Sequence, residues 1–130
     1  MSEGAIQFDH VHIISQTPEA TASWFVDNLG GKISNSQEIQ GAPQIYLEFE
    51  GARIIVRGQR PGEAASPKGG LEWGSDHFAF KVSGDFDGYC AALKEKGVKF
   101  TVEPRDFGTV ARIAFIEAPD GVSIELLQRK

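Results

Sequence analysis

The sequence has little cysteine, no excess of basic residues and no long hydrophobic run. Its 130 residues include one cysteine, Cys90, which excludes an internal disulfide and fits a reducing compartment. The net charge of −5 argues against nucleic acid or an anionic membrane as partner. The N-terminal stretch MSEGAIQF lacks the basic region and apolar core of a signal peptide, and no apolar run approaches bilayer length. We therefore expect a cytoplasmic protein with no nucleic-acid or membrane partner.

The length and composition are typical of one globular domain spanning residues 1–130. Hydrophobic residues make up 41% of the chain and charged residues 24%. A chain of this length can bury an adequate core without disulfides or a structural metal. Cys90 lies in a helical pattern with Leu93, so we interpret it as a small core residue and not as a nucleophile.

The second half of the sequence repeats the first. Asp9-His10 returns as Asp76-His77 at an offset of 67 (77 − 10), and each half has a strand, a glycine-terminated helix and three further strands. The repeat defines modules 6–58 and 75–128, joined by a connector at 59–74 that is rich in Gly, Pro and Ala. It predicts an α+β fold in which paired βαβββ modules form a curved mixed sheet, a cup with one open face.

Strand alternation predicts which side chains line the cup. In the stretch FDHVHIIS, His10 and His12 share one face while Val11 and Ile13 share the other. On the penultimate strand, we expect Ile113 and Phe115 to face the helix, which leaves Arg112 and Ala114 inward. The other residues expected to face inward are His10, His12, Tyr46, Glu48, His77, Ala79, Lys81 and Glu125. Polar groups gathered inside a concave sheet imply a ligand, a metal or water.

Three of these residues form a candidate metal site. His10 and His77 open the two modules, and Glu125 lies on the last strand. Two imidazoles and a carboxylate suit a divalent metal ion such as Fe, Mn, Ni, Zn or Co, and leave positions open for substrate or water. The ordinary alternative is that each residue is merely polar and half-exposed. Their repeat-related, inward positions favour the metal.

His12 has no counterpart in the repeat, because Ala79 occupies the matching position. Four roles are open to it: a fourth ligand, a general acid or base, a hydrogen-bonding partner of a ligand, or a solvated residue at the rim. We favour acid–base chemistry or hydrogen bonding. Glu48 is a second candidate base.

Further inward positions suit contacts with a substrate. We expect Arg57 or Arg112 to contact an anionic group, and Tyr46 to line the cup. The alternative for the arginines is pairing with nearby acids. Trp73, in the connector, either covers the site as an aromatic wall or anchors its own loop.

The stretches FDHVHIIS, DHFAFKV and EAPDGVSIELLQ resemble the vicinal oxygen chelate superfamily, the glyoxalase, bleomycin-resistance and extradiol-dioxygenase group. The resemblance covers residues 6–128. It implies paired βαβββ modules and metal ligands on their first and last strands, which correspond here to His10, His77 and Glu125. It also implies a small-molecule substrate and a homodimer, with a site that in some members is shared between chains.

One position departs from the family pattern. Ile55 aligns with Glu125, where glyoxalase I and methylmalonyl-CoA epimerase have a fourth ligand, and isoleucine cannot coordinate a metal. We expect a metal-dependent lyase or isomerase of the glyoxalase type. The alternatives are a ring-cleaving dioxygenase, a thiol transferase like those of fosfomycin resistance, and a metal-free binding protein of the bleomycin-resistance kind.

Overall fold

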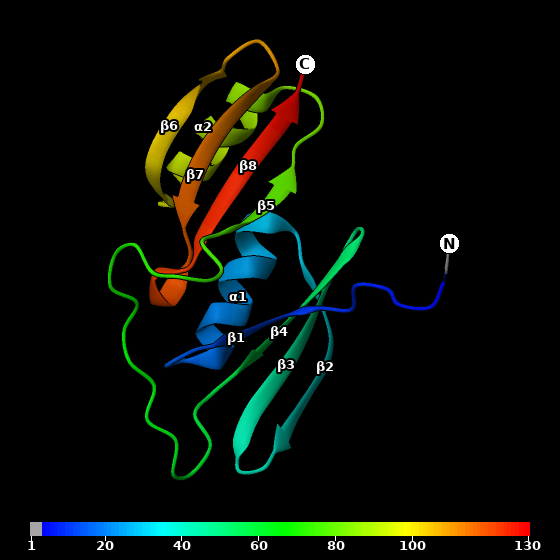
Figure 1. Cartoon of the computed structure of the whole chain (residues 1–130), viewed down its shortest axis with the longest axis vertical. Coiled ribbons are helices and arrows are strands. Elements are labelled where there is room, and N and C mark those ends of the chain that lie inside the picture. The colour runs from blue at the N-terminus through cyan, green and yellow to red at the C-terminus, as the bar shows by residue number, and fades with distance from the viewer. Residues whose placement is uncertain (1–3) are drawn as a thin grey trace. The chain divides into compact units, whose positions relative to one another are not determined.

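A computed structural model describes residues 4–130, which divide into two compact units. Unit 1 ends at Ala65 and unit 2 comprises Ser66–Lys130, so the boundary falls inside the expected connector. Each unit has one helix and four strands in the order βαβββ (Figure 1). The α+β fold built of paired βαβββ modules is confirmed, whereas the grouping of both units in one domain stays a prediction.

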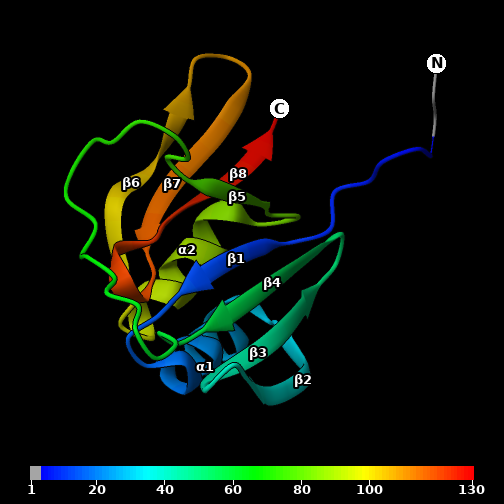
Figure 2. The ribbon, with the colours of Figure 1, turned by 60° about the horizontal axis from the view of Figure 1, so that its bottom comes forward.

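In unit 1 the chain forms a four-stranded mixed sheet with one helix. The elements are β1 (Val11–Ile14), α1 (Pro18–Leu29), β2 (Lys32–Ile39), β3 (Ala42–Phe49) and β4 (Ala52–Arg57). The strand order is β1-β4-β3-β2, with β1 parallel to β4 and the other pairs antiparallel (Figure 2). Gly30, in the left-handed conformation that glycine tolerates best, ends the helix.

Unit 2 repeats this topology. Its elements are β5 (Phe78–Lys81), α2 (Phe86–Glu95), β6 (Lys99–Phe107), β7 (Ala111–Glu117) and β8 (Ser123–Arg129). The strand order β5-β8-β7-β6 matches that of unit 1, and β5 is parallel to β8. A short 3₁₀ turn, Pro119–Gly121, joins β7 to β8. Neither helix in the described chain is long and apolar enough to cross a bilayer.

In each unit, the helix and the strands both contribute fully buried side chains to the core. In unit 1, Phe25 of α1 and Leu47 and Val56 of the sheet have no exposed surface. In unit 2, Cys90 of α2 is only 1% exposed, and burial raises the pKa of its thiol. This burial agrees with the interpretation of Cys90 as a core residue. The apolar strand positions thus stabilise each unit from one face of its sheet.

The strand register confirms the alignment of the two modules. His12 is opposite Ile55 in unit 1, and Ala79 is opposite Glu125 in unit 2. His10 and His77 lie immediately before β1 and β5.

The expected orientation of β7 is wrong. Phe115 is the register partner of Glu125, and opposed residues in an antiparallel pair point to the same face. Ala114 pairs with the buried Leu126, so the alternation places Arg112 and Ala114 on the helix side, and Ile113 and Phe115 on the other. Residues 113 and 114 are both at most 4% exposed, which removes the contrast between buried and exposed positions from which orientation is inferred.

Candidate metal and ligand site

His77 and Glu125 meet on the face of unit 2 opposite its helix. The parallel pairing of β5 with β8 brings the two side chains together, and His77 Nε2 lies 3.2 Å from Glu125 Oε1. The side chains are 30% and 18% exposed, respectively. They are therefore half-buried on the protein side and still open to a ligand.

Asp76 and Phe115 hold the His77 ring in place. His77 Nδ1 is hydrogen-bonded to Asp76 Oδ2 at 2.8 Å, and the ring meets the Phe115 ring edge-on at a centroid distance of 4.9 Å. Metal-binding histidines characteristically donate one ring N–H to a carboxylate, which fixes the ring and directs the other nitrogen to the metal. Asp76 thereby directs Nε2 of His77 toward the side on which Glu125 lies.

His10 has the same local arrangement in unit 1. Its Nδ1 is hydrogen-bonded to Asp9 Oδ2 at 2.6 Å, and its side chain is 33% exposed. The His10 and His12 rings lie 5.7 Å apart, centroid to centroid, on the same stretch of chain. The repeated Asp-His pair thus engages Nδ1 in both units, and in unit 2 the other ring nitrogen, Nε2, contacts Glu125.

The donor atoms of unit 2 fit a divalent metal ion. Two ligands of one metal, each about 2.1 Å from it and at right angles, lie about 3 Å apart. The 3.2 Å separation of His77 Nε2 and Glu125 Oε1 agrees with this, and imidazole with carboxylate suits first-row metals. Taken unit by unit, residues 4–130 contain no group of three potential ligands. The structure therefore brings two of the predicted ligands together in unit 2, and His10 lies in unit 1.

His12 lies on the sheet face opposite α1 and is exposed. Partial burial, followed by the positive charge of Arg57 and smaller contributions from His10 and Arg60, lowers the pKa of its imidazole. Its register partner, Ile55, is 5% exposed and offers no ligand atom. Unit 1 therefore has an imidazole where unit 2 has Ala79, and an isoleucine where unit 2 has Glu125.

Tyr46 and Glu48 both take part in hydrogen bonds within unit 1. The Tyr46 hydroxyl accepts from Gln44 Nε2 at 2.9 Å. Glu48 Oε2 accepts from Arg53 Nε and from Ser34 Oγ, both at 2.8 Å. The carboxylate expected to act as a base is thus already held by a cation and a hydroxyl.

Arg57 is paired within its own unit. Its guanidinium donates to both carboxylate oxygens of Glu63, at 2.6 and 3.2 Å, and the Arg57 side chain is 14% exposed. These hydrogen bonds, with one from the Arg60 backbone, lower the pKa of Glu63 to about 2. Arg57 therefore pairs with a local acid, Glu63, which is the alternative stated for the arginines.

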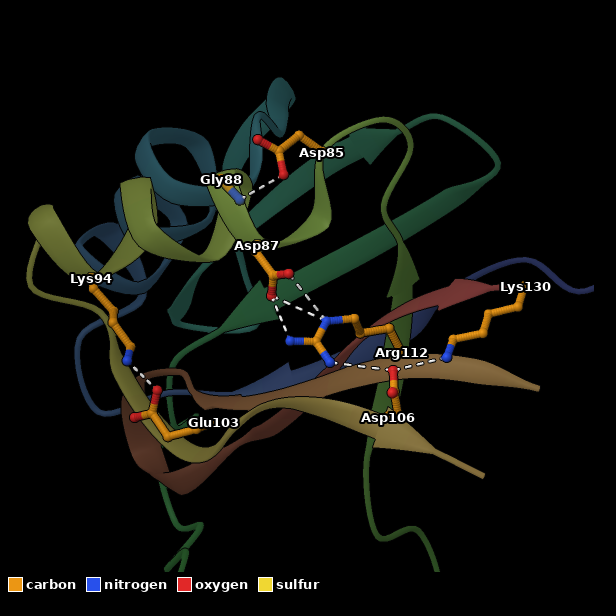
Figure 3. A network of polar contacts seen from close by, with 8 residues as sticks. All are labelled: Asp85, Asp87, Gly88, Lys94, Glu103, Asp106, Arg112 and Lys130. Atoms are coloured by element: carbon orange, nitrogen blue, oxygen red, sulfur yellow. Dashed lines mark hydrogen bonds and ion pairs between the residues drawn. The ribbon is translucent and has the colours of Figure 1, made fainter. Parts of the chain in front are cut away.

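Arg112 does not lie on the face of unit 2 that carries His77 and Glu125. Its guanidinium donates to Asp87 of α2 at 3.0 to 3.2 Å and to Asp106 of β6 at 3.2 Å, as Figure 3 shows. Lys130 also pairs with Asp106. The network ties the helix to the strands on the helix side, so the expected inward position of Arg112 is wrong and we leave it out of the proposed site.

Trp73 is fully exposed, at 104% of its reference surface, and Leu71 nearby is 93% exposed. The side chain thus neither covers a site nor anchors its loop within unit 2.

Four further residues contribute to these contacts without having been expected to do so from the sequence: Asp9, Asp76, Gln44 and Arg60. The first two are signalled by the repeat itself, because the aspartate recurs together with the histidine. Gln44 is a polar residue on β3 whose side chain is nonetheless buried, at 7% exposed, and the sequence of the strand does not predict this burial. Arg60 lies in the stretch expected to be a connector, where no periodicity guides assignment.

The two units share one βαβββ topology and one strand order, which defines the fold class of the protein. Residues 7–126 match the family model of the Glyoxalase/Bleomycin resistance protein/Dioxygenase superfamily. The chain belongs to this superfamily. A comparison with curated proteins found no match.

Solved structures with the same fold have different functions. A glyoxalase family protein from Enterococcus faecalis is 24% identical, with a TM-score of 0.77 over 95% of this chain and 98% of that one. TnmS3, an antibiotic binding protein from Streptomyces sp. CB03234, is 22% identical, with a TM-score of 0.73 over 97% and 98%. The fosfomycin resistance protein FosX from Listeria monocytogenes is 18% identical, with a TM-score of 0.74 over 95% and 93%. At these identities the likeness establishes the fold alone.

Proposed function

We propose that the protein is a metal-dependent enzyme that acts on a small oxygenated molecule. His77 and Glu125 supply two ligands for a divalent cation, and His10 supplies the third, within one chain or across a homodimer. The observation that carries this proposal is the 3.2 Å approach of His77 Nε2 to Glu125 Oε1, with Nδ1 of the same ring held by Asp76.

In this proposal the metal ion stabilises charge on the substrate and His12 transfers a proton. When bound, a divalent ion stabilises negative charge that develops on a substrate oxygen. His12 holds or moves a proton beside it, since its ring lies 5.7 Å from that of His10. Glu48 already accepts hydrogen bonds from Arg53 and Ser34, so we place proton transfer on His12.

Lyase or isomerase chemistry is the reaction that we propose. A ring-cleaving dioxygenase and a thiol transferase are the alternatives, the latter in keeping with the fold likeness to FosX. The reactions are separable by what they consume: a dioxygenase takes up oxygen, a thiol transferase consumes thiol, and an isomerase consumes neither.

Metal analysis of the purified full chain tests the proposal. After anaerobic reconstitution with Mn(II), Fe(II) or Zn(II) and removal of the excess, we expect stoichiometric metal in the wild type. We expect His77→Ala and Glu125→Ala to lose it. The matched control, His12→Ala, should retain it. A wild type that binds no metal, or a His77→Ala variant that binds as much as the wild type, contradicts the proposal.

The second candidate is a metal-free binding protein, favoured by the likeness to the antibiotic binding protein TnmS3. It predicts a wild type that binds no metal under reconstitution. The two imidazoles and one carboxylate at ligand positions support the enzyme instead, because sequestration of a drug does not need them.

A further inference from the structure

Arg60 lies on a loop that is fastened to the end of the unit 1 sheet. The Gly58 amide donates to the Pro43 carbonyl at 3.0 Å, and the Arg60 amide donates to Glu63 Oε1 at 2.9 Å. The Glu63 amide in turn donates to the Arg60 carbonyl at 3.0 Å. The loop also packs closely on the β2–β3 turn, since a Cβ at Gly41 would lie 2.9 Å from Pro61. Arg60 is therefore a fixed residue, although the sequence suggests a connector.

The Arg60 guanidinium is short of hydrogen-bond acceptors for its N–H groups. Its Nε is buried and has no hydrogen-bond partner, and its Nη2 reaches Gln44 Oε1 only at 3.5 Å, the limit of a hydrogen bond. Nε and Nη2 form the side-on edge of the guanidinium, which binds carboxylates through two parallel hydrogen bonds. A buried donor without an acceptor is destabilising, so this edge suits an acceptor from outside the chain.

Charge distinguishes Arg60 from its neighbour Arg57. Arg57 is neutralised by the two-point pairing with Glu63. Arg60 forms no ion pair through its guanidinium within residues 4–130. The nearest acid named by its contacts, Glu63, is bonded to the Arg57 guanidinium, and it meets Arg60 only through the backbone amide.

The partners of Arg60 place it on the same side of the sheet as His12. Gln44 links the Arg60 guanidinium to the Tyr46 hydroxyl, and Tyr46 is in register with Ile55, the partner of His12. Because Tyr46 accepts from Gln44, its own hydroxyl hydrogen is available to donate to a ligand.

We propose that the side-on edge of Arg60, supported by Gln44 and Tyr46, binds the carboxylate of a small-molecule ligand on the open face of unit 1. The assignment rests on the proposed function for one point only, that this carboxylate belongs to the substrate. Binding of the carboxylate itself needs no metal, so it is testable with metal removed.

The experiment follows the arginine Nε–H signals of the ¹⁵N-labelled full chain by NMR in the presence of EDTA. Benzoate is the probe, benzamide is its neutral analogue, and inorganic phosphate is the competing anion. We expect benzoate to shift the Arg60 signal saturably, benzamide to leave it unmoved, and phosphate to bind more weakly than benzoate. No shift with benzoate, an equal shift with benzamide, or tighter binding of phosphate would overturn the assignment.

Variants add a second criterion. Arg60→Gln should weaken benzoate binding by about tenfold or more, as expected for loss of charge-assisted hydrogen bonds. Arg60→Lys, which keeps the charge without the planar edge, should fall between it and the wild type. Arg105→Gln is the matched control, since Arg105 is an exposed arginine of unit 2, and it should bind benzoate like the wild type. Unchanged affinity in Arg60→Gln would contradict the assignment.

The two proposals fail separately. A protein that binds benzoate in EDTA but takes up no metal retains the carboxylate site and loses the enzyme proposal. A protein that takes up metal but does not bind benzoate loses only the carboxylate site.

Discussion

At the residue scale, the aspartates that precede the two histidines are the least conspicuous parts of the candidate site. Asp76 and Asp9 contact Nδ1 of His77 and His10 at 2.8 and 2.6 Å. In metal-binding histidines generally, an acid at this nitrogen fixes the orientation of the ring and directs the other nitrogen to the metal. Their role is therefore to position the histidines.

Removal of this contact should weaken metal binding without unfolding the chain. We expect Asp76→Ala to lower metal affinity about 10- to 100-fold, because the His77 ring loses the partner that fixes its orientation. Calorimetric titration with Zn(II) measures the effect. Asp76→Asn keeps an acceptor for the Nδ1 proton, so its metal affinity should lie between those of the wild type and Asp76→Ala. Equal affinity in the wild type and both variants would count against the positioning role.

The pairing of Glu63 with Arg57 should make the stability of the folded protein depend on pH in the acidic range. The folded pKa of Glu63 is lowered from 4.5 to about 2, so its contribution is fully present above pH 4.5 and is lost as the pH falls toward about 2. Melting temperatures of the wild type and Glu63→Gln should therefore differ at pH 6 and converge near pH 2. Glu72→Gln, in the exposed connector, is the control and should follow the wild type throughout. A difference that persists at the lowest pH would contradict the assignment.

At the scale of elements, α2 begins with a cap that requires glycine three residues later. Asp85 accepts from the Gly88 amide at 3.0 Å, and a Cβ at Gly88 would lie 2.2 Å from Asp85 Oδ2 (Figure 3). An alanine there must displace the capping carboxylate, although alanine is the better helix former.

The effect of Gly88→Ala should depend on Asp85. With Asp85 present, Gly88→Ala gains helix propensity but loses a cap that contributes about 1 kcal/mol, so we expect little net change in the free energy of unfolding. In an Asp85→Ala background the same change should stabilise the protein by about 0.5 to 1 kcal/mol. Urea unfolding of the four proteins measures this coupling. Equal effects of Gly88→Ala in both backgrounds would show that the cap and the side chain do not compete.

The sequence predicted the elements better than it predicted the direction of some side chains. Alternation succeeds on β3, where Ile45 and Leu47 are buried and Tyr46 and Glu48 are partly exposed. It fails on β7, where apolar residues occupy both faces and no contrast marks the helix side. The pairing with β8 decides the direction there, and that register depends on the turn at Pro119–Gly121.

Loop residues could not be placed from the sequence. Arg60 has a defined position because amides and carbonyls of residues 58–63 find partners on β3 and within the turn, a pattern with no period to detect. The Asp-His pairs were detectable, because the repeat places both residues together twice. The hydrogen bond between each aspartate and Nδ1 of its histidine could not be predicted from the repeat and is visible only in the structure.

At the scale of the whole molecule, the homodimer implied by the family resemblance stays a prediction. Light scattering after size-exclusion chromatography should give a mass twice the chain's 14.1 kDa. Because apolar side chains are suited to interfaces, we expect Trp73→Ser to shift the mass toward the monomer, given the full exposure of Trp73 in unit 2. A monomeric wild type over the accessible concentration range would contradict the dimer.

His77, Glu125 and His10 are proposed to hold one divalent metal ion. Anomalous diffraction from crystals of the full chain reconstituted with Co(II) tests it most directly. We expect one strong peak about 2.0 to 2.2 Å from His77 Nε2, His10 Nε2 and a carboxylate oxygen of Glu125, with the histidines from the same or from neighbouring chains. A peak held by other residues, or no peak at His77 and Glu125 in crystals that contain cobalt, would contradict it.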